Sequence, residues 1–171
     1  FAAMALLAAS VGYAATWQSV ADWTIFQTDQ GCGLEKVERQ GLRPSTLRLY
    51  RFADGRSAIE LGNDGWSIKA GDERKLYVLL DSEAFETGST APSDHKVLFP
   101  IDEETLKAFA SASFITVFLK VDSDHEMPLE QFSLSKSAAA LAGANRCLIE
   151  LKASRGAVER RERLVPSDPF S

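Results

Sequence analysis

The chain has 171 residues, of which 45% are hydrophobic and 25% charged, a composition typical of a folded globular domain. Its formal net charge of −5 argues against a nucleic-acid partner, because such a partner requires a basic surface. The sequence holds no Gly-rich phosphate loop and no Gly-x-Ser-x-Gly elbow, so we expect no bound cofactor and no nucleophilic enzyme of that kind.

The first 14 residues read as a cleavable secretion signal. Residues 1–15 are apolar and the first charged residue is Asp22, yet the run is shorter than the roughly 20 residues that a membrane span needs. Gly12 and Ala14 are small residues at the minus-three and minus-one positions that signal peptidase recognises, which predicts cleavage before Ala15. Because the segment opens on Phe1 without a basic start, we expect a signal truncated at its beginning. The alternative is a buried N-terminal helix.

Cleavage would leave a single β-rich domain, which we place at residues 15–156. The clearest local signal is Asp54-Gly55 between two alternating runs, because Gly takes the positive φ that a tight hairpin turn needs. The early strands are expected at residues 23–27, 34–38, 47–52, 57–61 and 66–69.

The middle of the chain adds a central strand and a short helix. Residues 75–80 are apolar on both faces, which predicts a buried strand. Asp102 precedes two acidic residues, which predicts a capped helix at 103–111. Two polar stretches are expected to be surface loops, at 83–96 and 122–128. Further strands are expected at 97–100, 114–119 and 131–134.

A second helix is expected near the end, with Ser135 or Ser137 as its N-cap. Its apolar stripe includes Cys147, so the helix would lie on the sheet. We expect residues 157–171 to form a mobile tail. Together these elements predict a mainly β (α+β) fold: an antiparallel sandwich or open barrel with the short helix and the C-terminal helix on one face.

The two cysteines, Cys32 and Cys147, are predicted to form a disulfide in an oxidising compartment. Closing a loop of about 115 residues would stabilise the domain by roughly 4–5 kcal/mol. A redox or nucleophilic cysteine is the alternative. Redox pairs usually lie two residues apart and neither cysteine has a neighbouring His, so we favour the structural bond.

Two Asp-His pairs fall in expected loops: Asp94 with His95, and Asp124 with His125. If the loops meet, two nitrogens and two oxygens could bind zinc, or could supply a general base with its orienting carboxylate. Adjacent side chains rarely point at one site, however, so the alternative is two solvated loops.

Trp66 follows a turn at residues 63–65 and is a candidate for contacting a partner protein. A buried Trp66 would belong to the core, whereas an exposed one would be an anchor for a partner. The segment from Ser133 to Lys136 falls at a strand-to-helix junction, so we do not assign it as a nucleophile site.

The framework of the chain resembles small exported proteobacterial proteins. An early strand with Trp23 and a first Cys32 are followed by Phe132-Ser133-Leu134, Ala139-Ala140-Leu141 and a final Cys147. This order is similar to the invasion-associated locus B proteins and to the TagO accessory proteins of type VI secretion. The resemblance implies an envelope protein without catalytic residues.

We therefore expect a non-catalytic periplasmic domain that binds or stabilises an envelope protein of unknown identity. The alternative is a small metal-binding protein or hydrolase that uses the two Asp-His loops.

Overall fold

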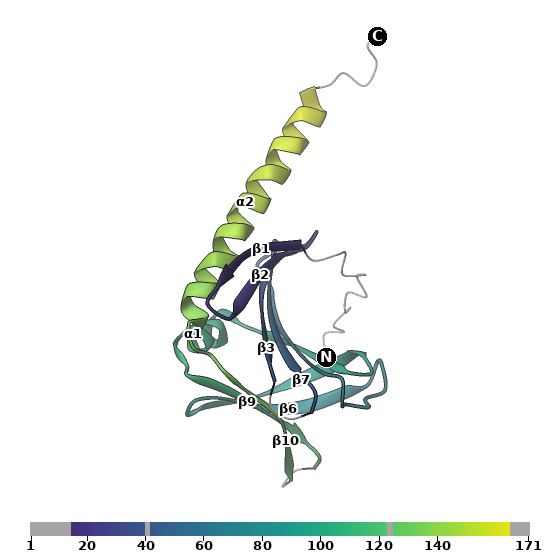
Figure 1. The fold of residues 1–171 in the computed structure, drawn as a ribbon. Helices are drawn as coiled ribbons and strands as arrows, with labels where there is room; N and C mark the ends of the chain where they lie inside the picture. Colours follow the sequence, from purple (N-terminus) through teal and green to yellow (C-terminus); the bar gives the residue numbers. More distant parts are fainter. Residues whose placement is uncertain (1–14, 40–41, 123–124, 165–171) are drawn as a thin grey trace.

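The computed structural model describes residues 15–39, 42–122 and 125–164, the side chains of 161–164 excepted. These residues form ten strands and two helices, with all ten strands in one antiparallel sheet (Figure 1). The expected mainly β fold is confirmed. The predicted signal at residues 1–14 lies outside the described residues, as does Asp124.

The sheet order is β1-β2-β3-β4-β5-β8-β7-β6-β9-β10. Its first half follows the chain: β1 (Ala15–Val20), β2 (Trp23–Gln27), β3 (Gly31–Glu38), β4 (Ser45–Phe52) and β5 (Ser57–Asn63). Its second half contains β6 (Glu73–Leu80), β7 (Glu83–Ser93), β8 (Lys96–Ile101), β9 (Phe114–Lys120) and β10 (Glu126–Ser133). The predicted hairpin joins β4 to β5, where Gly55 has a φ of 93°.

The sheet bends, so that β10 approaches the distant strands β3 to β5 (Figure 1). The Lys36 Nζ donates to the Ser133 carbonyl oxygen at 2.7 Å, and the Glu38 carboxylate accepts the Ser133 backbone N–H at 2.9 Å. The Glu130 carboxylate accepts hydrogen bonds from Ser45 Oγ and from Asn63 Nδ2. Because β1 and β10 are the ends of the strand order, the bent sheet remains open.

The core fills the inside of this bend. Alternate side chains of the central strands point inward and are fully buried, as strand periodicity requires. Trp23 lies among them with no exposed surface, and its Nε1 donates to the Ser135 carbonyl oxygen at 2.8 Å. The fully buried large side chains include Trp23, Phe99, Phe109, Phe132, Ile25, Leu34, Leu47 and Leu49.

The two helices pack against each other and close one side of the core. Helix α1 (Glu103–Ser111) is capped as predicted, because the Asp102 Oδ1 accepts the backbone N–H of Thr105 at 2.8 Å. Helix α2 (Ser137–Leu164) packs its first half on β1 to β4. Its second half extends away from the sheet (Figure 1). Among the described residues, no helix is long and apolar enough to cross a membrane.

Several local predictions were wrong. Strand β10 already begins at Glu126, inside the loop expected at 122–128, and Ser137 is the first residue of α2 rather than its N-cap. The expected loop at 83–96 is mostly strand β7, which is stabilised by pairing with β6 and β8 rather than by large apolar side chains. The expected strand at 66–69 is irregular. The last helix continues to Leu164 past Gly156, because the residues that follow include strong helix formers, which offset the cost of one glycine.

Candidate functional site

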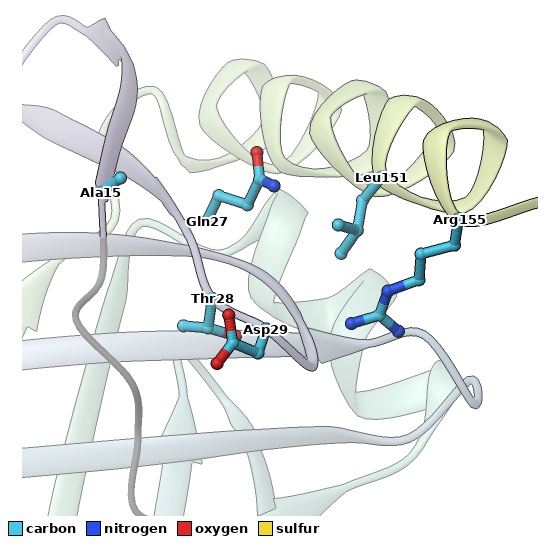
Figure 2. A pocket seen from close by; sticks show the side chains of 6 residues that line it. All are labelled: Ala15, Gln27, Thr28, Asp29, Leu151 and Arg155. Atoms are coloured by element: carbon cyan, nitrogen blue, oxygen red, sulfur yellow. The ribbon is translucent and has the colours of Figure 1, made fainter. Parts of the chain in front are cut away.

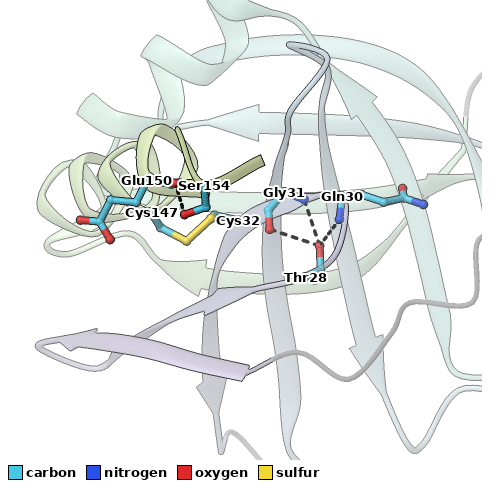
Figure 3. Close-up of a disulfide and its surroundings, with 7 residues drawn as sticks. All are labelled: Thr28, Gln30, Gly31, Cys32, Cys147, Glu150 and Ser154. Carbon is cyan, nitrogen blue, oxygen red and sulfur yellow. Dashed lines mark hydrogen bonds between the residues drawn. A yellow bond between two sulfur atoms is a disulfide. The ribbon is translucent and has the colours of Figure 1, made fainter. Parts of the chain in front are cut away.

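The disulfide between Cys32 and Cys147 fixes the middle of α2 to β3 (Figure 3). The two Cα atoms are 6.1 Å apart, and both side chains are buried in the core. Gly143, one turn before Cys147, lies against Ile25 of β2, where a Cβ would overlap the Ile25 Cδ1. The missing side chain therefore lets the helix approach the sheet closely enough for the bond. The structure contains the disulfide that the sequence predicted.

A shallow pocket opens where α2 leaves the sheet (Figure 2). Its volume is about 360 Å³, at the lower end of the range for ligand sites. Six residues line it: Ala15, Gln27, Thr28, Asp29, Leu151 and Arg155. Figure 2 shows the Asp29 carboxylate and the Arg155 guanidinium at opposite sides, with Leu151 between the helix and the strands. The pocket thus offers one group of each charge beside an apolar surface.

The turn between β2 and β3 positions the sheet side of this pocket. The Thr28 Oγ1 accepts the backbone N–H groups of Gln30 and Gly31, and the Thr28 N–H donates to the Gly31 carbonyl oxygen at 2.8 Å (Figure 3). Cys32 follows immediately in β3. Residues 28–32 therefore form the turn and also carry the disulfide to α2. This connection limits how far the two walls of the pocket can separate.

A second hollow of about 450 Å³ lies beside the start of α2. Its lining is rich in hydroxyl groups and includes Ser111, Ser113, Ser133, Ser135, Lys136 and Ser137. The Ser133 Oγ accepts the Ser135 N–H at 3.3 Å, and the Ser137 Oγ donates to the Phe109 carbonyl oxygen at 3.2 Å. These hydroxyl groups therefore hold the strand-to-helix junction in place.

The structure places the two histidines in separate turns. His95 lies between β7 and β8, and its Nδ1 is 2.7 Å from the Trp66 carbonyl oxygen. His125 lies between β9 and β10, and its Nδ1 is 2.8 Å from an Asp122 carboxylate oxygen. The carboxylate partner of His125 is thus Asp122, three residues earlier, a contact that was not predicted from the sequence. The spacing is that of an Asp side chain closing a local turn.

The strand order separates the two histidine turns. Strands β7 and β6 lie between β8 and β9, so the turns are three interstrand spacings apart, or roughly 14 Å along the sheet. Within the ranges that the structure describes, no three His, Cys, Asp or Glu side chains form a group that could hold a metal ion. Asp94 is exposed, and Asp124 lies outside those ranges. The shared metal site therefore stays a prediction.

Trp66 is half-buried and packs against the core. Its backbone N–H donates to the Asn63 carbonyl oxygen at 3.0 Å, and its own carbonyl oxygen faces His95. The Trp66 side chain is thus neither fully buried in the core nor fully exposed. Its role as a partner contact stays a prediction.

An aromatic cluster on the outer face of the sheet was not predicted. The rings of Phe26 and Tyr50 meet edge to face at 5.4 Å, and Tyr50 stacks on Phe52 at 5.9 Å between ring centres. Burial, with the negative charge of Glu60 adding to it, raises the pKa of Tyr50 to about 12. The signal in the sequence was the alternation of β4, because Arg48, Tyr50 and Phe52 occupy one face.

Comparison with known proteins supports the fold. No protein-family model matches the chain, and no curated protein matches it. A solved structure, invasion associated protein B from Bartonella henselae, superimposes with a TM-score of 0.56 at 17% sequence identity. The match covers 82% of this chain and 99% of that one. The weak resemblance noted from the sequence is thus confirmed at the level of the fold.

Proposed function

We propose that this chain is an exported accessory protein of the bacterial cell envelope, which binds a partner in the periplasm and catalyses no reaction. The observation that carries the proposal is the Cys32–Cys147 disulfide, because such bonds form and persist in oxidising compartments. The fold likeness to an invasion associated protein adds support.

We place the binding site at the pocket between the β2–β3 turn and α2. Supporting this choice, the pocket joins an apolar side chain, Leu151, to the opposite charges of Asp29 and Arg155. It also lies at the start of β1, an end strand of the sheet, where an extended segment of a partner could add by backbone hydrogen bonds. The other end strand, β10, is less suitable, because Pro128 cannot donate and Ser133 is held by β3.

Because the signal is expected to be truncated at its beginning, export is tested by expressing the chain in a bacterial host behind an added Met and two Lys residues, and by releasing the periplasm with osmotic shock. We expect the released protein to begin at Ala15 and to carry no free thiol. The variant Ala14→Arg should stay uncleaved in the membrane fraction, because a large charged residue blocks the cleavage site. Recovery of the reduced, uncleaved wild-type chain in the cytoplasm would contradict the proposal.

Binding is tested by capture from a periplasmic extract with the oxidised chain as bait. Asp29→Arg reverses one charge of the pocket, and the matched control Asp64→Arg makes the same change at the exposed turn after β5. We expect the captured partner to be lost with the first variant only. Equal capture by both would remove the pocket from the proposal. Zinc bound at one equivalent and lost in His95→Ala would instead support the metal-binding alternative.

A further inference from the structure

The first residue of β1 lies at the rim of the pocket between the β2–β3 turn and α2. Ala15 pairs with Gln27, and both residues line the pocket together with Asp29 (Figure 2). Paired Cα atoms lie about 5 Å apart and two residues of chain span at most about 7 Å, so the Cα atoms of Ala15 and Asp29 are no more than about 12 Å apart. A charge on the backbone nitrogen of Ala15 would therefore act on the Asp29 carboxylate.

The two charged side chains of this pocket have no charged partner. Within the part of the chain that the structure describes, the side chains of Asp29 and Arg155 take part in no ion pair and no hydrogen bond. Figure 2 shows them on opposite sides of the pocket, where the turn is held by Thr28 and the helix by the disulfide. The carboxylate and the guanidinium are thus held apart, and each can bind another group.

Cleavage of the signal would add a third charge to the pocket. Hydrolysis of the peptide bond between Ala14 and Ala15 leaves a carboxylate on Ala14 and an amine on Ala15. The amine takes up a proton at neutral pH, because an α-amino group has a pKa of about 7.7–8.0. The mature pocket then carries two positive groups and one negative group, whereas the uncleaved chain has one of each.

We propose that the α-ammonium of mature Ala15 completes the binding site: it pairs with Asp29 and leaves Arg155 to bind the C-terminal carboxylate of the partner. This inference rests on the proposed export and on cleavage before Ala15. Leu151 lies beside Arg155, so an apolar terminal residue fits the pocket. A segment added antiparallel to β1 runs toward Ala15, which brings its C-terminal end to the pocket. The site is therefore complete only after export.

The first measurement is the pKa of the α-amino group in the exported, mature protein. It is obtained from the rate at which an acylating reagent labels the N-terminus as the pH rises, at about 10 mM salt, where screening acts over about 30 Å. We expect a pKa above about 8, because the Asp29 carboxylate stabilises the charged form. Asp29→Asn should lower this pKa, and Arg155→Gln should raise it. The control Asp64→Asn, at an exposed turn, should leave it unchanged.

The second measurement is the binding of an acetylated five-residue peptide that ends in leucine, followed by NMR shifts. The same peptide with a C-terminal amide is the matched probe, because it lacks only the carboxylate. We expect the acid to bind roughly fivefold more tightly than the amide, and Arg155→Gln to remove this difference. The acid should also bind more tightly than acetyl-leucine, which has no backbone to pair with β1. Equal binding of these two would overturn the capture of a chain end.

A Gly-Ser pair inserted between Ala14 and Ala15 moves the ammonium without changing the charge of the protein. The small residues that signal peptidase recognises stay in place, so the mature chain begins up to about 7 Å before Ala15. We expect this variant to bind the peptide acid roughly threefold more weakly, because Asp29 is no longer neutralised and repels the carboxylate.

A mature chain that begins at another residue would overturn this inference together with the predicted cleavage site. If the chain begins at Ala15, an amine pKa that is the same in wild type and Asp29→Asn would overturn the inference alone. Equal peptide binding by the wild type and the insertion variant would do the same. Capture of a partner at the pocket would then stand without a role for the N-terminus.

Discussion

Removing the bond between Cys32 and Cys147 tests how the ends of the domain are held together. The bond spans 115 residues in sequence, and a loop of this length is worth about 5 kcal/mol on the chain-entropy model. A domain of this size has a total stability of roughly 5–15 kcal/mol. We therefore expect Cys32→Ala/Cys147→Ala to lower the free energy of unfolding by about 3–5 kcal/mol and to leave the domain only marginally stable.

The assay is urea unfolding followed by tryptophan fluorescence, since Trp23 is buried beside the start of α2. With a slope of about 2 kcal/mol per molar urea, the midpoint should fall by roughly 2 M. Reduced wild-type protein is the matched control, because it keeps both side chains and loses only the covalent bond. A single transition is expected, since Ala140, Ala144 and Leu148 also bury α2 against the core.

Equal midpoints for the oxidised protein, the reduced protein and the double variant would refute this reasoning. They would mean that the folded domain gains nothing from closing the loop. An early separate transition of α2 in the variant would refute a narrower point, namely that apolar packing alone keeps the helix docked.

Three further predictions follow from particular contacts. Gly156→Ala should stabilise the domain by about 0.5–1 kcal/mol, because an added Cβ has no atom nearby and alanine has the higher helix propensity. Gly143→Ala should destabilise the domain, because its Cβ would overlap the buried Ile25 side chain. A melting temperature that is higher for Gly143→Ala than for Gly156→Ala would contradict this prediction. Lys36→Met should cost roughly 2–4 kcal/mol in urea unfolding, because the nearly buried ammonium of Lys36 pairs with Asp22 and Glu38, and an unchanged midpoint would show the pairs to be neutral. The pKa of Tyr50 is about 12 in the folded protein and near 10 when unfolded, so its contribution to stability is complete below pH 10 and is lost as the pH rises to 12; a Tyr50→Phe variant with the same alkaline unfolding curve would disprove it.

Local signals in the sequence predicted the elements whose cause is local. The turn at Gly55 and the cap at Asp102 each depend on residues within a few positions, and both are present. Strand β7 was missed because its evidence is the backbone pairing with β6 and β8, which no window of its own sequence contains. The true end of α2 was missed because one glycine was given more weight than the helix formers after it.

The candidate site was less predictable for the same reason. Cys32 and Cys147 could be paired from chemistry alone, since they are the two cysteines of the chain. The pocket, in contrast, joins the β2–β3 turn to Leu151 and Arg155, and nothing in either segment indicates the other. The polar contacts of Lys36 and Glu130 across the bend likewise depend on a curvature that no local pattern specifies.

The disulfide also determines how the domain would respond to mechanical force. A pull along α2 reaches Cys147 and passes through the covalent bond to Cys32, and from there to β2 and β1. For a pull between the end of α2 and the start of β1, the segment between the two cysteines, which carries most of the sheet, lies outside the covalent path that bears the tension. While the disulfide is intact, force applied through the extended helix would detach β1 and β2 before it unfolded the segment between the two cysteines.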